Sequence, residues 1–163
     1  MPTREPGDHE RPLPLDPDIE TDEGPDGEPL PVHLTWRFML LVAIGGTGGT
    51  ATRYALDGLV GTDGGFPLAT FVINLSGALV LGILLEAFAL RGSDVDHRRR
   101  FRLLLGTGFL GGYTTYSALA VETDMLIRNG QPWLALAYPL GTVALGLCAS
   151  IAGIAIARRE FDR

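Results

Sequence analysis

The stretch from Leu103 to Val121 carries no charged residue and is long enough to cross a bilayer, whose hydrocarbon core takes about 20 apolar residues. It is nevertheless a poor continuous helix, because glycines lower helix propensity and hydroxyl side chains compete for backbone hydrogen bonds. The interrupting residues are Gly106, Gly108, Gly111, Gly112, Thr114, Thr115 and Ser117. Unpaired backbone at membrane depth is tolerated only inside protein or beside a hydrated cavity. The stretch therefore predicts either a broken helix beside an ion or solute site, or a glycine-rich helix packed closely on its neighbours.

Four hydrophobic segments follow one another, at about 34–60, 67–90, 102–125 and 133–157. Short connections separate them, and these leave no room for a soluble catalytic domain, so we do not expect an enzyme. The fold class predicted from this pattern is an all-α membrane protein with four transmembrane helices, of which the third is broken.

Residues 1–33 form a different region, with ten acidic residues, two arginines, eight prolines and no aromatic residue. Such a composition cannot bury enough apolar surface to offset the entropy lost on ordering. We therefore expect a disordered, acidic, proline-rich tail on a four-span domain at 34–163. The tail has neither the basic start nor the apolar core of a signal peptide.

Arginine placement predicts the orientation of the spans. Outside the tail, alternation of four spans leaves only Arg53 and Arg128 on one side. The other side receives Arg37, Arg91, Arg98, Arg99, Arg100, Arg102, Arg158, Arg159 and Arg163. This bias predicts a multi-pass membrane protein with one fixed topology and both termini in the cytoplasm.

The polar residues within the spans are mostly hydrogen-bond donors. Arg53 ends the first span, Asn74 lies in the second, and Tyr138 and Thr142 share one face of the fourth. Each has a plainer interpretation, which is snorkelling for the arginine and helix packing or interhelical hydrogen bonds for the others. Because the acids Glu86, Glu122 and Asp124 lie only at span edges, this set of donors favours a small anion as the transported species.

Glycines in the first span raise a different possibility, since Gly46, Gly48 and Ala51 fit a dinucleotide-binding fingerprint. The acidic residue that this site needs about 20 positions later is absent, so we set the oxidoreductase interpretation aside. Gly45 and Gly49 instead predict close helix approach. A single cysteine lies in the fourth span, where we expect a buried and inert thiol.

Three motifs together make the region from about Thr35 to Arg158 resemble the small bacterial fluoride channels, the Fluc or CrcB family. They are GGTGGTATRY, FPLATFVINLSG and GTGFLGGYTTYSALAVE, in that order. The resemblance implies a four-span subunit in an antiparallel, dual-topology-type dimer that lets fluoride leave the cytoplasm passively and so reduces fluoride toxicity. It also implies a structural sodium ion, held by backbone carbonyls at the positions of Gly111 and Thr114. The partners implied are fluoride, lipid and a second subunit, with no nucleic acid.

By motif position the resemblance assigns the anion path to residues from all four spans. These residues are Arg53, Asn74, Tyr116, Ser117, Leu119, Glu122, Tyr138 and Thr142. Tyr116 and Leu119 stand where the family carries pore phenylalanines, since TTYSAL replaces TTFSTF. A tyrosine keeps the positive ring edge that can face an anion, and a leucine does not.

Antiparallel pairing of identical chains needs nearly balanced arginines, and nine against two is not balanced. We therefore favour a heterodimer with an oppositely inserted homologue over a pair of identical copies. Two alternatives to a conducting subunit stay open. One is a non-conducting scaffold subunit of a heterodimeric fluoride channel. The other is a small proton-coupled multidrug exporter, which would need a titratable carboxylate inside the membrane.

Overall fold

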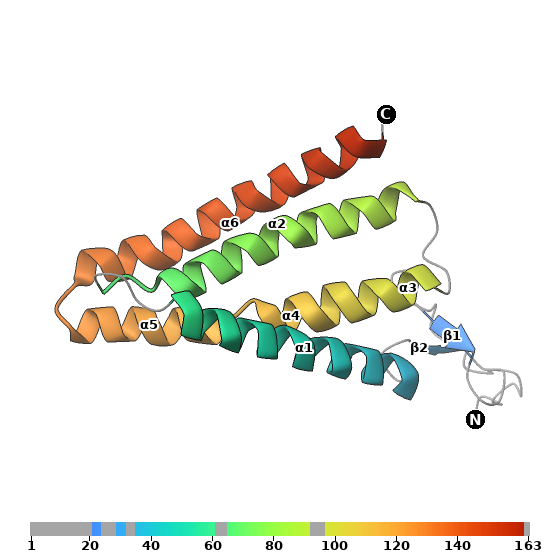
Figure 1. Cartoon of the computed structure of the whole chain (residues 1–163), viewed down its shortest axis with the longest axis horizontal. Helices are drawn as coiled ribbons and strands as arrows, with labels where there is room; N and C mark the ends of the chain where they lie inside the picture. The colour runs from blue at the N-terminus through green and yellow to red at the C-terminus, as the bar shows by residue number, and fades with distance from the viewer. Residues whose placement is uncertain (1–20, 24–28, 32–34, 61–64, 92–96, 162–163) are drawn as a thin grey trace, which may run out of the picture. The chain divides into compact units, whose positions relative to one another are not determined.

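The computed structural model describes residues 21–23, 29–31, 35–60, 65–91 and 97–161 (Figure 1). The chain divides into two compact units, Met1–Met39 and Leu40–Arg163. In the first unit, strands β1 (Thr21–Glu23) and β2 (Pro29–Pro31) form an antiparallel pair. The predicted disorder of the tail stays a prediction, because most of residues 1–33 lie outside the described residues.

The predicted hydrophobic segments correspond to helical regions with nearly the same bounds. The first is α1 (Trp36–Val60), the second is α2 (Leu68–Leu90), and the last is α6 (Pro132–Phe161). The third begins with a short helix α3 (His97–Phe101) and ends with α5 (Tyr116–Arg128). Gly130 has a φ of +73° in the tight turn before α6, a conformation that glycine adopts at little cost.

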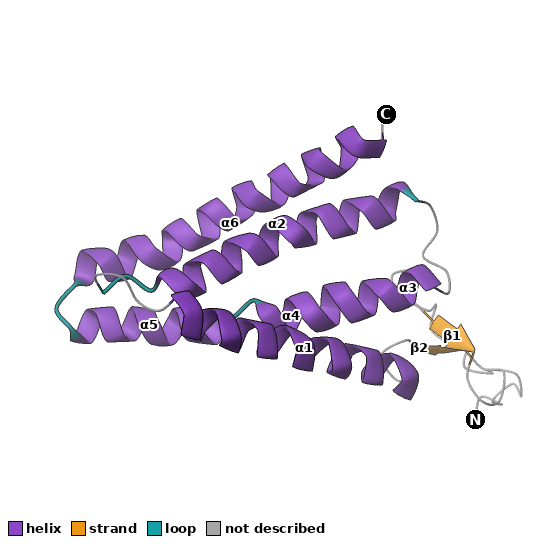
Figure 2. Ribbon diagram, viewed as in Figure 1, coloured by secondary structure: helices purple, strands orange, loops and turns teal. Residues whose placement is uncertain are grey.

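The third segment is not one helix (Figure 2). After α3 the chain forms a π-helix, η2 (Arg102–Leu110), and a single turn, α4 (Gly111–Tyr113). Thr114 and Thr115 are then extended, with ψ angles of 157° and 125°, before α5 begins. Of the two possibilities that the sequence left open, the described structure therefore has the broken helix, and the wider π-helical winding was not predicted.

Helices α2 and α6 lie side by side along most of their length (Figure 1). Glycines allow this approach, because a Cβ on Gly82 would collide with the backbone of Ser150. A Cβ on Gly153 would likewise collide with the carbonyl oxygen of Leu79 and lie 2.9 Å from the amide nitrogen of Ile83. Such small-residue contacts are how helices pack closely in a membrane, where apolar burial gives little driving force.

A second glycine seam joins α1 to the third segment. A Cβ on Gly45 would collide with the carbonyl oxygen of Leu104, and one on Gly49 with that of Phe109. From the other side, a Cβ on Gly112 would collide with the carbonyl oxygen of Gly46. The prediction that Gly45 and Gly49 permit close helix approach is confirmed.

Two of the described helices, α2 and the Pro132–Glu160 part of α6, are long and apolar enough to cross a membrane, with mean hydropathies of 2.3 and 2.1. Only 28% and 17% of their most apolar windows are buried, which is unlike a core helix of a soluble domain. The outward apolar side chains of α6 include Leu136, Leu140, Val143, Leu147 and Ile151. The expectation that Cys148 is buried is wrong, because it lies on the exposed surface of the chain.

Replacing Gly153 by alanine should destabilise the protein, because its Cβ meets backbone that cannot move aside. We expect a loss of about 1–3 kcal/mol in the free energy of unfolding, measured in mixed detergent and denaturant. The matched control is Gly146→Ala on the same helix, whose Cβ would only touch the Cβ of Ala78 at 3.9 Å. Equal losses for both variants would contradict the backbone contact.

Candidate functional site

The break in the third segment is built by the two threonines between α4 and α5. Thr115 has φ −149° and ψ 125°, and its Oγ1 accepts a hydrogen bond of 3.2 Å from the amide of Ala118, which makes it the N-cap of α5. The same Oγ1 lies 3.1 Å from Oγ of Ser117. The hydroxyl cluster seen in the sequence therefore begins a new helix in the middle of an apolar segment.

Asn74 of α2 pairs with both backbone polar groups of Thr115. Its Nδ2 donates to the Thr115 carbonyl oxygen at 3.0 Å, and its Oδ1 accepts from the Thr115 amide at 2.8 Å. Only this orientation of the side-chain amide satisfies both groups. The geometry thus matches the plainer interpretation of Asn74, an interhelical hydrogen bond, here made to backbone.

Several carbonyl oxygens lose their helical partners at the break, those of Gly111 and Thr114 among them. In a continuous helix the Thr115 amide would donate to the Gly111 carbonyl and the Ala118 amide to the Thr114 carbonyl. Here those amides donate to Asn74 Oδ1 and to Thr115 Oγ1. The carbonyls of Gly111 and Thr114 are the type of ligand that a hard cation prefers, so the residues present fit such an ion.

Two clefts lie on either side of this break. One, of about 320 Å³, is lined by Asn74, Gly111 and Thr114 among other residues. The other, of about 410 Å³, is lined by Arg53, Thr70, Thr115, Ser117 and Glu122, again among others. Because Asn74 lines the first cleft and Thr115 the second, their hydrogen-bonded pair separates the two.

Arg53 contributes the positive charge of the larger cleft. It is half-buried on α1, and within the described part of the chain it forms no hydrogen bond or ion pair. A guanidinium keeps its charge at any physiological pH. The arginine is therefore placed where its donors can meet an anion that enters this cleft.

Glu122 accepts two short hydrogen bonds inside the protein. Thr70 Oγ1 donates to its Oε1 at 2.7 Å, and the Tyr138 hydroxyl donates to its Oε2 at 2.6 Å. Thr142 Oγ1 in turn donates to the Tyr138 carbonyl oxygen at 2.7 Å. The structure thus connects three predicted residues, Glu122, Tyr138 and Thr142, through contacts that also involve Thr70, a residue that sequence reasoning missed.

Aromatic rings fix the position of Tyr138, which is only 2% exposed. The ring of Phe66 lies edge-on to that of Tyr138 at a centroid distance of 5.5 Å and to that of Phe71 at 5.6 Å. Edge-to-face contacts of this kind stabilise a ring beyond its area burial. The hydroxyl of Tyr138 is therefore held at Glu122 by packing on its other side.

Tyr116 and Leu119 are not brought to either of these two clefts. Tyr116 is 81% exposed and points away from the body of its own chain. Leu119 is 5% exposed and packs in the α5–α6 core with Leu126, Ala135 and Tyr138. Tyr116 could therefore line a pathway only at a surface that this chain forms with another molecule.

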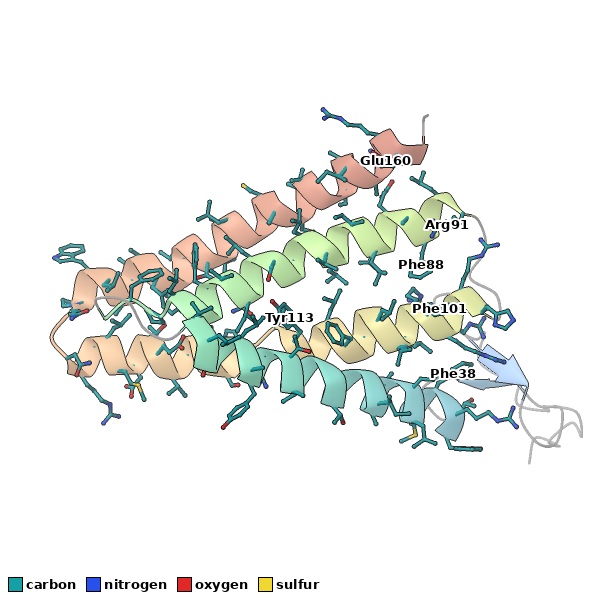
Figure 3. All side chains as sticks on the ribbon, in the orientation of Figure 1. Phe38, Phe88, Arg91, Phe101, Tyr113 and Glu160 are labelled. Carbon is teal, nitrogen blue, oxygen red and sulfur yellow. The ribbon has the colours of Figure 1, made fainter. Side chains whose placement is uncertain are left out.

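Tyr113 is a residue whose place the sequence did not reveal. Its side chain lies at the break (Figure 3). The hydroxyl is 2.9 Å from Ser76 Oγ, and because Ser76 donates its own hydroxyl hydrogen to the Ile73 carbonyl oxygen, Tyr113 is the donor. Its ring stacks on that of Phe109 at 6.1 Å. The only sequence signal was its position in the GGYTTYS motif beside the break.

One protein-family model matches most of the region described above. It is described as "CrcB-like protein, Camphor Resistance (CrcB)" and matches residues 40–154, which hold both glycine seams, the break and both clefts. The chain belongs to the CrcB family. Membership in this membrane-embedded family agrees with the exposed apolar helices α2 and α6.

Curated relatives of this CrcB chain carry a common name. A protein of Leifsonia xyli subsp. xyli, named "Fluoride-specific ion channel FluC 2", is 52% identical over 126 residues, which cover 77% of this chain and 87% of the relative. Proteins named "Fluoride-specific ion channel FluC" from Paracoccus denitrificans and Rhodopseudomonas palustris are 44% and 42% identical, over 75% and 73% of this chain and 95% of each relative. These names describe ion channels and not enzymes.

Replacing Tyr138 by phenylalanine tests the Glu122 network. The ring contact with Phe66 remains, but one oxygen of the carboxylate loses its buried donor, so we expect a loss of about 2 kcal/mol in the free energy of unfolding. The control is Tyr54→Phe, because Tyr54 is 82% exposed. If the two variants were equally stable, the Tyr138–Glu122 bond would contribute nothing to stability.

Proposed function

We propose that this chain is a subunit of a fluoride-specific ion channel that lets fluoride leave the cytoplasm passively, down its electrochemical gradient. The observation that carries the proposal is the similarity to a relative named a fluoride-specific ion channel. This chain is 52% identical to that relative over 87% of the relative's length. The exit of fluoride would reduce its toxicity to the cell. No catalytic step is needed for this function.

The larger cleft supports an anion as the transported species. Arg53 supplies charge, and the hydroxyl group of Ser117 supplies a hydrogen-bond donor on its wall, whereas the hydroxyl hydrogen of Thr70 is already donated to Glu122. Two carboxylates, Asp57 and Glu122, also line this cleft. Glu122 already accepts from Thr70 and Tyr138, which offsets part of its repulsion of an anion. In the proposed path fluoride exchanges water for the donors of Arg53 and Ser117. By resemblance the path also includes Asn74 and passes Tyr138 and Thr142, whose hydroxyl hydrogens are bonded to Glu122 and to the Tyr138 carbonyl.

The assembly proposed is an antiparallel dimer of four-span subunits in the plasma membrane, with cytoplasmic termini for this chain. The outward position of Tyr116, 81% exposed, suits a residue that completes a pathway with a second molecule. Nine arginines against two, outside the acidic tail, favour one insertion direction. The partner we favour is therefore an oppositely inserted homologue, with a second copy as the other possibility.

A sodium ion at the break is the proposed structural cofactor. The carbonyls of Gly111 and Thr114 would hold it, because the amides that would pair with them in a continuous helix are bonded elsewhere. Gly111 also lies on the exposed surface, and within the described structure a Cβ there would meet no atom within 4 Å. When bound, the ion would supply positive charge to these carbonyl dipoles and would be held in common by two subunits.

A scaffold subunit that does not itself conduct is the second candidate. The buried position of Leu119, in the α5–α6 core and away from both clefts, favours it, because one of the two expected pore positions then lines nothing. The exporter alternative has no comparable support, since the relatives reported above are named as fluoride channels.

Fluoride efflux from liposomes that contain this chain alone tests the proposal. A fluoride electrode should record selective efflux, with chloride-loaded liposomes as the control. Efflux from this single chain would also argue against an obligate partner. If the liposomes are silent, co-reconstitution with an oppositely oriented homologue should restore the flux. Silence in both experiments would contradict a conducting subunit and leave the scaffold candidate.

Replacing Arg53 by glutamine should reduce fluoride flux about fivefold. A unit charge about 4 Å from an anion in a water-like medium contributes about 1 kcal/mol, which the neutral side chain cannot supply. Arg128→Gln is the matched control, because Arg128 is a cation that is already paired with Asp124 at 2.6 Å. Equal fluxes in the two variants would remove Arg53 from the proposed path.

A further inference from the structure

The contact between Asn74 and Thr115 suggests a specific task for this asparagine. We propose that Asn74 is a positioning residue that holds the break open, so that the carbonyls of Gly111 and Thr114 stay available to a cation. This inference rests on the sodium site proposed above. It differs from the role as an anion donor that the resemblance implied, because here the side-chain amide acts on backbone and through it on the ion.

The side-chain oxygen of Asn74, which we call its acceptor arm, determines where one buried backbone amide donates. Thr115 is only 7% exposed, so its amide must find an acceptor within the protein. Asn74 Oδ1 accepts it at 2.8 Å. Without that oxygen, the acceptor that helix geometry supplies is the Gly111 carbonyl, four residues earlier. The Gly111 oxygen would then be occupied by a hydrogen bond.

The side-chain nitrogen of Asn74, its donor arm, keeps the backbone of Thr115 extended. Asn74 Nδ2 donates to the Thr115 carbonyl at 3.0 Å, so one planar amide pairs with the residue as a neighbouring strand would. Extended backbone at Thr115 is also what allows its Oγ1 to accept from the Ala118 amide, which removes that amide from the Thr114 carbonyl. Both arms act together, because the side-chain amide cannot turn away without losing both bonds.

The rest of α2 makes Asn74 a firm point of attachment. On the same helix, a Cβ on Gly77 would collide with the methyl group of Thr114, so the absence of a side chain there lets Thr114 pack against α2. Ser76 receives the hydroxyl of Tyr113 at 2.9 Å. Three consecutive residues of the break, 113 to 115, are therefore held by α2, and Asn74 makes the contacts that act on backbone.

The test compares thermal stability of the purified full-length protein in sodium and in N-methylglucamine across a sodium titration. Wild type should be stabilised by sodium with a measurable midpoint concentration. Asn74→Leu, which removes both arms, should abolish the stabilisation or raise the midpoint at least tenfold. Asn74→Asp, nearly equal in size, sets an oxygen against the Thr115 carbonyl and should also raise it tenfold. If Asn74→Leu does not fold, the sodium midpoint of Asn74→Asp tests the inference.

Ser76→Ala is the matched control, because it removes a contact of α2 with the same turn but leaves both arms on Thr115. It should lower stability equally in sodium and in N-methylglucamine, with an unchanged midpoint. A folded Asn74→Leu or Asn74→Asp protein with the wild-type midpoint would overturn the inference. A wild type that ignores sodium would instead overturn the proposed sodium site, and fluoride efflux would report separately on the channel function.

Discussion

A peptide group at membrane depth has no water to bond, so every interruption of a helix there must be repaired by the protein. The break after α4 depends on this constraint. Asn74 forms hydrogen bonds with the carbonyl and the amide of Thr115, and Thr115 Oγ1 accepts one from the amide of Ala118. Thr50 Oγ1 donates to the Gly112 carbonyl at 3.3 Å. The repair satisfies these groups and leaves the carbonyls of Gly111 and Thr114 available, and the two clefts form on either side of it.

Close helix packing makes that repair possible, because a side chain as short as asparagine reaches a neighbouring backbone only when the helices nearly touch. Gly77 lets the break lie against α2, and the glycines of α1 do the same from another side. In lipid, such contacts replace the apolar driving force of a soluble core. The glycines therefore serve both stability and the placement of polar groups.

Much of the fold followed from local pattern. The helical segments could be predicted from uncharged apolar runs, and the break from glycines and hydroxyls crowded between Leu103 and Val121. The interactions that define the site are long-range and could not. Nothing local to Asn74 indicates that its amide meets Thr115, 41 residues away, and nothing local to Glu122 indicates Thr70. Burial of Leu119 and exposure of Cys148 depend in the same way on which helix face meets a neighbour, and the roles assigned to the predicted site residues by resemblance stay predictions.

The pairing of α2 with α6 has a consequence for the way the chain is made. These helices lie in contact although the whole third segment separates them in sequence (Figure 1). During synthesis α2 must therefore enter the membrane and wait, with Gly82 and its neighbours against lipid or against the insertion machinery, until α6 emerges. The third segment is produced in that interval, when α1 and α2, the helices that its glycine seam and its break contact, are already present. The polar backbone of the break can thus be satisfied before the bundle is complete, whereas the face of α2 that α6 will cover stays exposed longest.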